Sequence, residues 1–303
     1  MDKLQALERS LPATLCRGID MTGADRGQIS ELRLRAGRPY AIMIGTRPWF
    51  FSENSLISIP NGRCLCPSLE ELTLTLARLS EYSLHKHPAA LSKGYLTVKG
   101  GHRIGVCAAR NEEGAADASA ISSLSIRVAG EVEGCAAKLM ERTQSEGPAS
   151  VLLAGPPLSG KTTLLRDFAR LLSDSPLLHK VVVADERGEL AALYGGKNPM
   201  KLGTCCDVVD ALGKGEALDC ALRALSPEFI VFDELGGEED LKTLALAAGR
   251  GIRVIASVHA QRQGERLPRL LRRIASFDVF DYIVFLKDRE LGVIESLERM
   301  EKL

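Results

Sequence analysis

The chain has 303 residues, enough for two domains of ordinary size, and its 45% apolar content is typical of a globular protein with a buried core. Lys plus Arg and Asp plus Glu are balanced at 39 each, so the net charge of zero does not favour a nucleic-acid partner. An uninterrupted apolar run of membrane-spanning length is missing, and the acid-containing N-terminal segment lacks the apolar stretch of a signal peptide, so we expect neither feature.

Residues 1–130 predict a small mixed α+β domain. Residues 1–15 have the pattern of a short amphipathic helix, and leucines at helical spacing predict a second helix over residues 69–84. Extended segments lie between turns that contain Gly and Pro. The candidate strands are 31–36, 40–44, 49–51, 94–98, 103–106 and 123–128.

Residues 131–148 predict a helical connector, and residues 149–303 predict a second domain. In that domain short apolar segments alternate with helices, which indicates an α/β fold with a parallel sheet. The candidate strands are 151–154, 180–184, 229–232, 253–258 and 282–285. The candidate helices are 163–172, 218–225 and 239–249. This order of elements is that of a RecA-like nucleotide-binding core.

One segment of this domain matches a phosphate-binding motif without a mismatch. Residues 155–162 have the sequence Gly-Pro-Pro-Leu-Ser-Gly-Lys-Thr, which fits G-x-x-x-x-G-K-[ST] between an apolar strand and a helix. In this Walker A motif the loop amides hold phosphates, the lysine reaches the β- and γ-phosphates, and the hydroxyl binds Mg²⁺. We therefore predict a nucleotide site with Lys161 as a catalytic residue and Thr162 as a metal ligand. Its nucleotide-binding residues are Gly155, Pro156, Pro157, Leu158, Ser159, Gly160, Lys161, Thr162 and Thr163.

Two further apolar strands end in pairs of acids, Asp233-Glu234 and Asp185-Glu186. Because the carboxyl ends of parallel strands meet at one edge of a sheet, these acids are expected beside the phosphates. The first pair has the Walker B pattern, so Asp233 is predicted to hold Mg²⁺, mostly through water. A capping acid at an ordinary strand end is the alternative. Glu186 is our preferred residue for aligning the attacking water, with Glu234 as the next candidate.

Histidine and arginine side chains supply the remaining candidates. His259 ends a third strand, where a role at the γ-phosphate and a role as a polar cap are equally consistent with the pattern. Arg187 is a candidate for contacting phosphate or a neighbouring subunit, or for a surface salt bridge. Four arginines of the first domain are candidates for an arginine supplied in trans, although most such residues are salt-bridged or solvated: Arg33, Arg35, Arg103 and Arg127.

Several of these segments together resemble one known family. The matching segments are 31–35, 94–105, 122–127, 155–157, 160–167, 185–187, 207–210, 226–228 and 233–236. They run nearly end to end, and the blocks Gly-Gly-His-Arg and Asp-Glu-Arg are more specific than the Walker A motif alone. The chain resembles the stage III sporulation AA family, ATPases of endospore-forming bacteria that are related to type II and type IV secretion ATPases.

The resemblance implies Mg²⁺-dependent ATP hydrolysis by a homo-hexameric, AAA-type ring with an N-terminal domain packed on the ATPase core. It assigns the catalytic glutamate to Glu186, the Walker B acids to Asp233 and Glu234, and the His box to His259. It also implies a cytoplasmic position at the mother-cell membrane, where the protein would energise or assemble a channel complex and have membrane proteins as partners.

Two other functions stay open. A nucleotide-binding scaffold with little turnover is one, because Gly237 and the pair Cys205-Cys206 stand where the family leads us to expect arginines. A RecA-like ATPase acting on nucleic acid is the other, although the neutral charge and the missing basic aromatic patch disfavour it.

Overall fold

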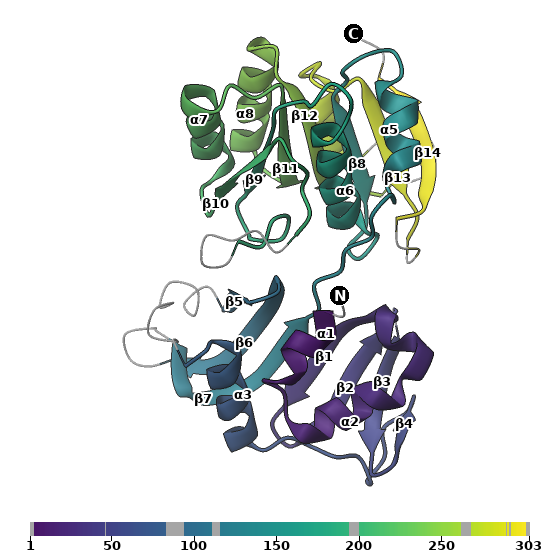
Figure 1. The fold of residues 1–303 in the computed structure, drawn as a ribbon, viewed down its shortest axis with the longest axis vertical. Helices are drawn as coiled ribbons and strands as arrows, with labels where there is room; N and C mark the ends of the chain where they lie inside the picture. The colour runs from purple at the N-terminus through teal and green to yellow at the C-terminus, as the bar shows by residue number, and fades with distance from the viewer. Residues whose placement is uncertain are drawn as a thin grey trace. The chain divides into compact units, whose positions relative to one another are not determined.

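The computed structural model describes residues 3–45, 47–82, 94–110, 116–193, 200–261, 268–288, 290 and 292–300. These residues form two compact units, and the chain passes from the first to the second between Gly130 and Glu131. Figure 1 shows the two units in different colours along the chain. Within the described residues, no helix combines the length and the apolar character needed to cross a bilayer.

The first unit is an antiparallel sheet with helices packed against it (Figure 1). Its strands are β1 (Ile29–Arg35), β2 (Arg38–Ile44), β3 (Arg47–Ser52), β4 (Ser55–Ile57), β5 (Tyr95–Val98), β6 (His102–Arg110) and β7 (Ala116–Arg127). They are arranged in the order β4-β3-β2-β1-β7-β6-β5. Its helices are α1 (Lys3–Glu8), α2 (Ala13–Met21), the 3-10 helix η1 (Gly23–Gln28) and α3 (Leu69–Leu79).

One hydrophobic core holds this unit together. Leu32 and Leu34 point to the same face of β1 and are fully buried with Ile19 of α2 and Leu76 of α3. The predicted strands are present, whereas helix α3 is shorter than expected and stops at Leu79. Glu81 and Tyr82 follow with positive φ angles of 51° and 57°, which ends the helical conformation, and residues 83–84 lie outside the described part.

The second unit is a mostly parallel sheet covered by helices on both faces (Figure 1). Its strands are β8 (Val151–Gly155), β9 (Val181–Asp185), β10 (Cys206–Asp210), β11 (Phe229–Leu235), β12 (Arg253–His259), β13 (Tyr282–Leu286) and β14 (Ile294–Arg299). They lie in the order β10-β9-β11-β12-β8-β13-β14, in which β14 alone is antiparallel to its neighbour. Its helices are α5 (Ala137–Gln144), α6 (Lys161–Ser173), α7 (Lys214–Ala224), α8 (Glu238–Gly249) and α9 (Arg269–Ala275).

The sheet separates two hydrophobic cores. Phe229 and Val231 of β11 pack into the core formed with α5 and α6, whereas Ile230 and Phe232 pack into the core formed with α7, α8 and α9. A strand buried on both faces needs an apolar residue at every position, which explains the continuous apolar segments of the sequence. In the predicted connector, only residues 137–144 are helical, and α5 packs beside α6 in this unit.

Strand β12 lies between β8, which leads into the glycine loop, and β11, which ends in the Walker B acids. His259 of β12 is in register with Gly155 of β8. On the other side, Phe232 of β11 is in register with Ala184 of β9, so the residues that follow them, Asp233 and Asp185, lie at the same level near the ends of their strands. The sheet order therefore brings strand ends from distant parts of the sequence to one edge.

Candidate functional site

The glycine loop connects the end of β8 to the first residue of α6. Gly160 has a φ of +92°, a left-handed conformation that favours glycine. A Cβ atom on Gly155 would lie 2.6 Å from Ser159 Oγ and 3.1 Å from Leu286 Cβ. The loop is thus folded tightly, and the motif glycines occupy the positions where side chains do not fit. Leu158 at the tip is 70% exposed and has a φ of +64°.

Lys161 is buried inside this loop, with only 6% of its surface exposed. Its Nζ atom donates hydrogen bonds to the carbonyl oxygens of Gly155, at 2.9 Å, and Pro156, at 2.7 Å. His259 Nδ1 lies 3.2 Å from the same Nζ atom. Burial lowers the pKa of Lys161 to about 8, although the nearby carboxylates of Asp233 and Glu234 act in the opposite direction.

Asp233 is a buried carboxylate at the end of β11. One of its oxygens accepts hydrogen bonds from the backbone N–H of Glu234, at 3.0 Å, and from Ser257 Oγ, at 3.4 Å. Burial raises the pKa of Asp233, the Glu234 N–H lowers it, and the negative charges of Asp185 and Glu234 raise it further. The fold therefore holds an acid whose charge is poorly compensated by its own surroundings.

These residues fit a magnesium ion bound together with phosphate. A cation beside Asp233 would offset the buried charge, and Thr162 lies in the first turn of α6, after the loop lysine. Within the described part of the chain, no cluster of three or more Cys, His, Asp or Glu side chains is arranged to hold a metal alone. Mg²⁺ commonly binds through one or two protein groups, with phosphate and water as its other ligands, so this donor set suits it.

Glu234 links the loop lysine to a neighbouring strand end. Its Oε2 accepts a hydrogen bond of 2.5 Å from Arg187 Nη1, and its Oε1 lies 3.5 Å from His259 Nε2. Since His259 also contacts Lys161, one polar network runs from Arg187 through Glu234 and His259 to the phosphate loop. The structure thus brings together Lys161, His259, Glu234 and, beside them, Asp233.

Asp185, which lies beside Asp233 at the end of the neighbouring strand β9, binds the backbone of the turn that follows it. Its two carboxylate oxygens accept hydrogen bonds of 2.7 to 3.2 Å from the backbone N–H groups of residues 189–192. Arg166 of α6 donates to carbonyl oxygens of the same segment, at 2.7 Å to Leu190 and 2.6 Å to Glu189. Buried carboxylate and guanidinium groups therefore fix the turn that follows β9.

Glu186 belongs to a separate group of charges. Its Oε2 accepts a hydrogen bond of 2.9 Å from Lys214 Nζ, at the start of α7. The sequence analysis missed Lys214, although a lysine in the first turn of a helix opposes the helix dipole and is a signal of a special position. It also missed Ser257, which is the polar residue two positions before His259 in an otherwise apolar strand.

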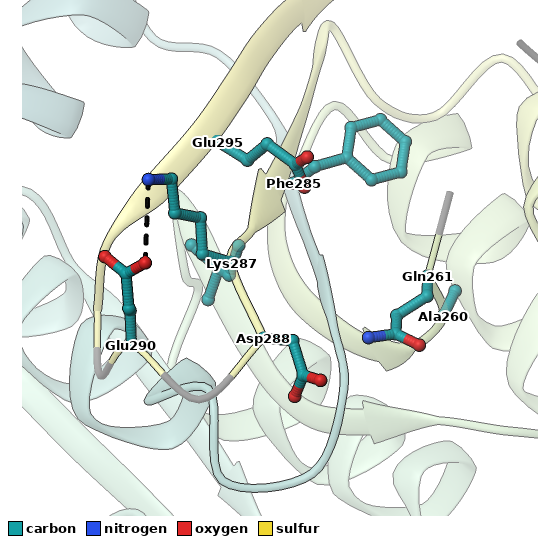
Figure 2. A pocket seen from close by; sticks show the side chains of 8 residues that line it. Ala260, Gln261, Phe285, Lys287, Asp288, Glu290 and Glu295 are labelled. Carbon is teal, nitrogen blue, oxygen red and sulfur yellow. Dashed lines mark ion pairs between the residues drawn. The ribbon is translucent and has the colours of Figure 1, made fainter. Parts of the chain in front are cut away.

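A depression of about 410 Å³ lies at the ends of β12 and β13. Figure 2 shows its lining, with the ion pair between Lys287 and Glu290 at 3.6 Å. The turn between β13 and β14 contacts the phosphate loop directly, because the Gly292 N–H donates to the carbonyl of Ser159 at 2.8 Å. With Asp288, Glu290 and Glu295 in its lining, the depression disfavours phosphate and offers acceptors to hydroxyl and amino groups.

The candidate arginines of the first unit have partners or neighbours within its sheet. The Arg103 guanidinium lies 4.0 Å from the centroid of the Tyr95 ring, a cation–π contact. Arg127 of β7 is in register with Arg103 of β6 on one side and with Glu31 of β1 on the other. An action of either arginine in trans stays a prediction.

Comparison with known proteins gives a family and a fold. The model of the family "Sporulation stage III, protein AA" matches residues 1–299. Stage III sporulation protein AA of Bacillus subtilis (strain 168) is 33% identical over 277 residues, which cover 89% of this chain and 86% of that protein.

Solved structures share the architecture at low sequence identity. The ATPase DotB of Legionella pneumophila aligns with a TM-score of 0.57 at 16% identity, covering 91% of this chain and 76% of that chain. The pilus retraction motor PilT, solved with bound ADP, aligns with a TM-score of 0.55 at 17% identity, covering 89% of this chain and 76% of that chain. The predicted fold, a RecA-like P-loop ATPase core with a smaller N-terminal α+β domain, is confirmed. The chain belongs to the sporulation stage III protein AA family.

Proposed function

We propose that this protein binds ATP with Mg²⁺ and hydrolyses it as a secretion-type ATPase. The observation that carries the proposal is Lys161, a buried ammonium group held inside a complete phosphate loop and connected through His259 to the acid Glu234. The described residues place no carboxylate in direct contact with this buried lysine, so it needs an anion to compensate its charge, and phosphate is the anion that this loop is built to hold.

Each group of the site has a role in this proposal. On nucleotide binding, Lys161 exchanges the carbonyl oxygens of Gly155 and Pro156 for phosphate oxygens. The loop amides and the N-terminal end of α6 stabilise the negative charge that develops on the transferred phosphoryl group. Mg²⁺, when bound, would neutralise phosphate charge, with Thr162 and Asp233 as its protein ligands, the latter in part through water.

Glu186 is our candidate for aligning the attacking water. Arg187 and His259 approach the two oxygens of Glu234, so that side chain is engaged in the network of the loop. Glu186 uses one oxygen for Lys214, and the described residues provide no hydrogen bond to the other. A carboxylate with an open oxygen at the end of the strand beside β11 can orient a water molecule toward the γ-phosphate.

The cellular role follows from the family and from the names of the structural relatives. We propose that the chain works as a homo-hexameric ring at the cytoplasmic face of the mother-cell membrane. There it would energise or assemble the sporulation channel complex, with membrane proteins of that complex as partners. Arg103 or Arg127 would complete the site of a neighbouring subunit. Nucleic acid is not among the proposed partners, because the charges of the chain are balanced.

A nucleotide-binding scaffold with little turnover is the second candidate. Gly237 favours this function. The family leads us to expect an arginine at this position, next to the Walker B acids, and a glycine there supplies no positive charge for hydrolysis. The two functions share nucleotide binding and differ in turnover, so one set of variants separates them.

The test measures ATP binding and phosphate release on the same preparations. Lys161→Ala removes the buried cation, so binding weakens at least tenfold and turnover disappears. Glu186→Gln keeps the hydrogen-bonding shape but not the charge, so it binds ATP as the wild type does and loses all but a small residual rate of turnover. Lys138→Ala, on the exposed surface of α5, is the matched control and behaves as the wild type. Normal hydrolysis by Lys161→Ala would contradict the proposal, and tight binding without turnover in the wild type would select the scaffold.

A further inference from the structure

Lys214 lies at the centre of a group of charges beside the proposed catalytic glutamate. Its ammonium group is 2.9 Å from Glu186 Oε2 and 3.7 Å from Asp240 Oδ1. The lysine side chain is only 13% exposed, whereas that of Glu186 is 44% exposed. The contact therefore differs from a surface ion pair, in which both side chains move freely in solvent.

Asp240 connects Lys214 to the turn that follows the Walker B acids. Its Oδ2 accepts hydrogen bonds from the backbone N–H groups of Gly236, at 2.8 Å, and Gly237, at 3.3 Å. Its other oxygen faces Lys214. A continuous path of polar contacts therefore runs from the turn after β11, through Asp240 and Lys214, to the glutamate after β9.

A lysine at the position of Lys214 is unfavourable for the stability of its helix. It is the first residue of α7, where the helix dipole disfavours a positive charge. The depression around it is lined by four acids, Glu186, Glu216, Glu239 and Asp240, and among the described lining residues Lys214 alone carries a positive charge. Without its ammonium group, Glu186 would face like charges and would have no partner to hold its side chain in one rotamer.

We propose that Lys214 is a positioning residue for ATP hydrolysis: it holds one oxygen of the Glu186 carboxylate and so directs the other toward the attacking water. This inference rests on the proposed function, since it assigns Glu186 the role of aligning water. Lys214 touches neither nucleotide nor water in this scheme and acts through Glu186. Its loss therefore lowers kcat and leaves nucleotide binding by the phosphate loop intact.

The experiment compares steady-state ATP hydrolysis and ADP binding in the full-length chain. Lys214→Met keeps the length of the side chain and removes its charge, and we expect kcat to fall about tenfold while KM and the ADP Kd change less than twofold. Lys214→Arg keeps the charge and recovers most of the rate. Lys242→Met is the matched control, because it removes another Lys–Glu pair, at 2.9 Å, in which both side chains are exposed, and it leaves kcat unchanged. Lys214→Gln replaces Lys214→Met if that variant does not fold.

The double variant Glu186→Gln/Lys214→Met identifies the route of the effect. If Lys214 acts through Glu186, the double variant is no slower than Glu186→Gln alone. An unchanged kcat in Lys214→Met, in a protein in which Glu186→Gln lowers turnover to a small residual rate, would overturn the positioning role and leave the proposed function intact. A further loss in the double variant, or equal losses of kcat and ADP binding in Lys214→Met, would also overturn it. A wild type that hydrolyses no more ATP than Lys161→Ala would overturn both proposals.

Discussion

Lys161 is buried and positively charged, and its contacts within 3.2 Å are carbonyl oxygens and a histidine nitrogen. Burial disfavours the charged form, which is why the pKa of this lysine falls from its ordinary value to about 8. Phosphate oxygens restore a favourable environment for the charge and raise the pKa again. Nucleotide binding and protonation of Lys161 are therefore coupled.

This coupling predicts that nucleotide affinity falls at alkaline pH. Above pH 8 the free protein loses the Lys161 proton, whereas the complex keeps it, so binding takes up a proton and Kd rises up to about tenfold per pH unit. Fluorescence titrations with ADP between pH 7 and pH 9.5 measure the slope. Lys161→Arg keeps its charge throughout this range and gives a flatter profile. A wild-type Kd that is constant over this interval would refute the coupling.

The raised pKa of Asp233 leads to a prediction about the folding stability of the nucleotide-free protein. Burial raises the pKa of this carboxyl above its unfolded value, so the stability that it contributes is full at low pH and is lost as the pH rises through the folded-state pKa. Above the folded-state pKa the ionised carboxylate therefore destabilises the nucleotide-free protein. Asp233→Asn cannot ionise, so it increases the unfolding free energy there, measured by urea denaturation without nucleotide at alkaline pH, and it abolishes hydrolysis. Asp207→Asn, on the exposed side of β10, is the control. A loss of stability in Asp233→Asn would contradict this account.

At the scale of elements, the turn after β9 depends on one carboxylate. Asp185 is fully buried and accepts hydrogen bonds from the consecutive backbone N–H groups of residues 189–192. Asp185→Ala leaves these donors without a partner in the interior, so we expect the unfolding free energy to fall by about 3 kcal/mol or more. Thermal and urea unfolding measure the loss, with Asp207→Ala as the exposed control. Stability equal to that of the wild type would show that other groups hold the turn.

The elements that the sequence predicted well are those whose environment is uniform along the element. Strands β8, β9, β11, β12 and β13 are buried on both faces, so each is visible as an apolar segment, and the predicted bounds differ from the observed ones by a few residues. Strands β10 and β14 lie at the edges of the sheet and mix polar with apolar residues, and neither was among the candidate strands. Helix α7 begins at Lys214, before the apolar periodicity that predicted its start at residue 218.

Some residues of the site could be predicted from short sequence motifs, whereas their contacts depend on how distant segments come together in the fold. Short motifs were enough to predict the phosphate loop and the acids near the end of β11. The strand, turn and helix of a P-loop are contiguous in the sequence, so a local pattern identifies them. The partners of the acids depend on sheet order, which places β9 beside β11 and brings Arg187 to Glu234. The contact of Glu186 with Lys214 likewise joins segments that are 28 residues apart. No local pattern encodes such pairs, so only the folded structure reveals them.

At the scale of the whole molecule, the first unit has one hydrophobic core and the second has two, one on each face of its sheet, and the site described above is formed within the second unit. The described residues of the site are Lys161, Asp233, Glu234, Glu186 and His259. Among the described residues, Arg187 is the arginine in contact with the acids near the end of β11. If a neighbouring copy supplies the missing positive charge, as proposed, activity depends on assembly, and the rate per protomer rises with protein concentration.

The measurement that tests the central claim most directly is steady-state ATP hydrolysis with Mg²⁺ as a function of protein concentration, with light scattering on the same samples. The account predicts that phosphate release per protomer increases as the scattering mass increases toward that of a ring, and that Lys161→Ala releases no phosphate at any concentration. Phosphate release that is absent in the wild type at every concentration, or that is equal in the wild type and in Lys161→Ala, would contradict it.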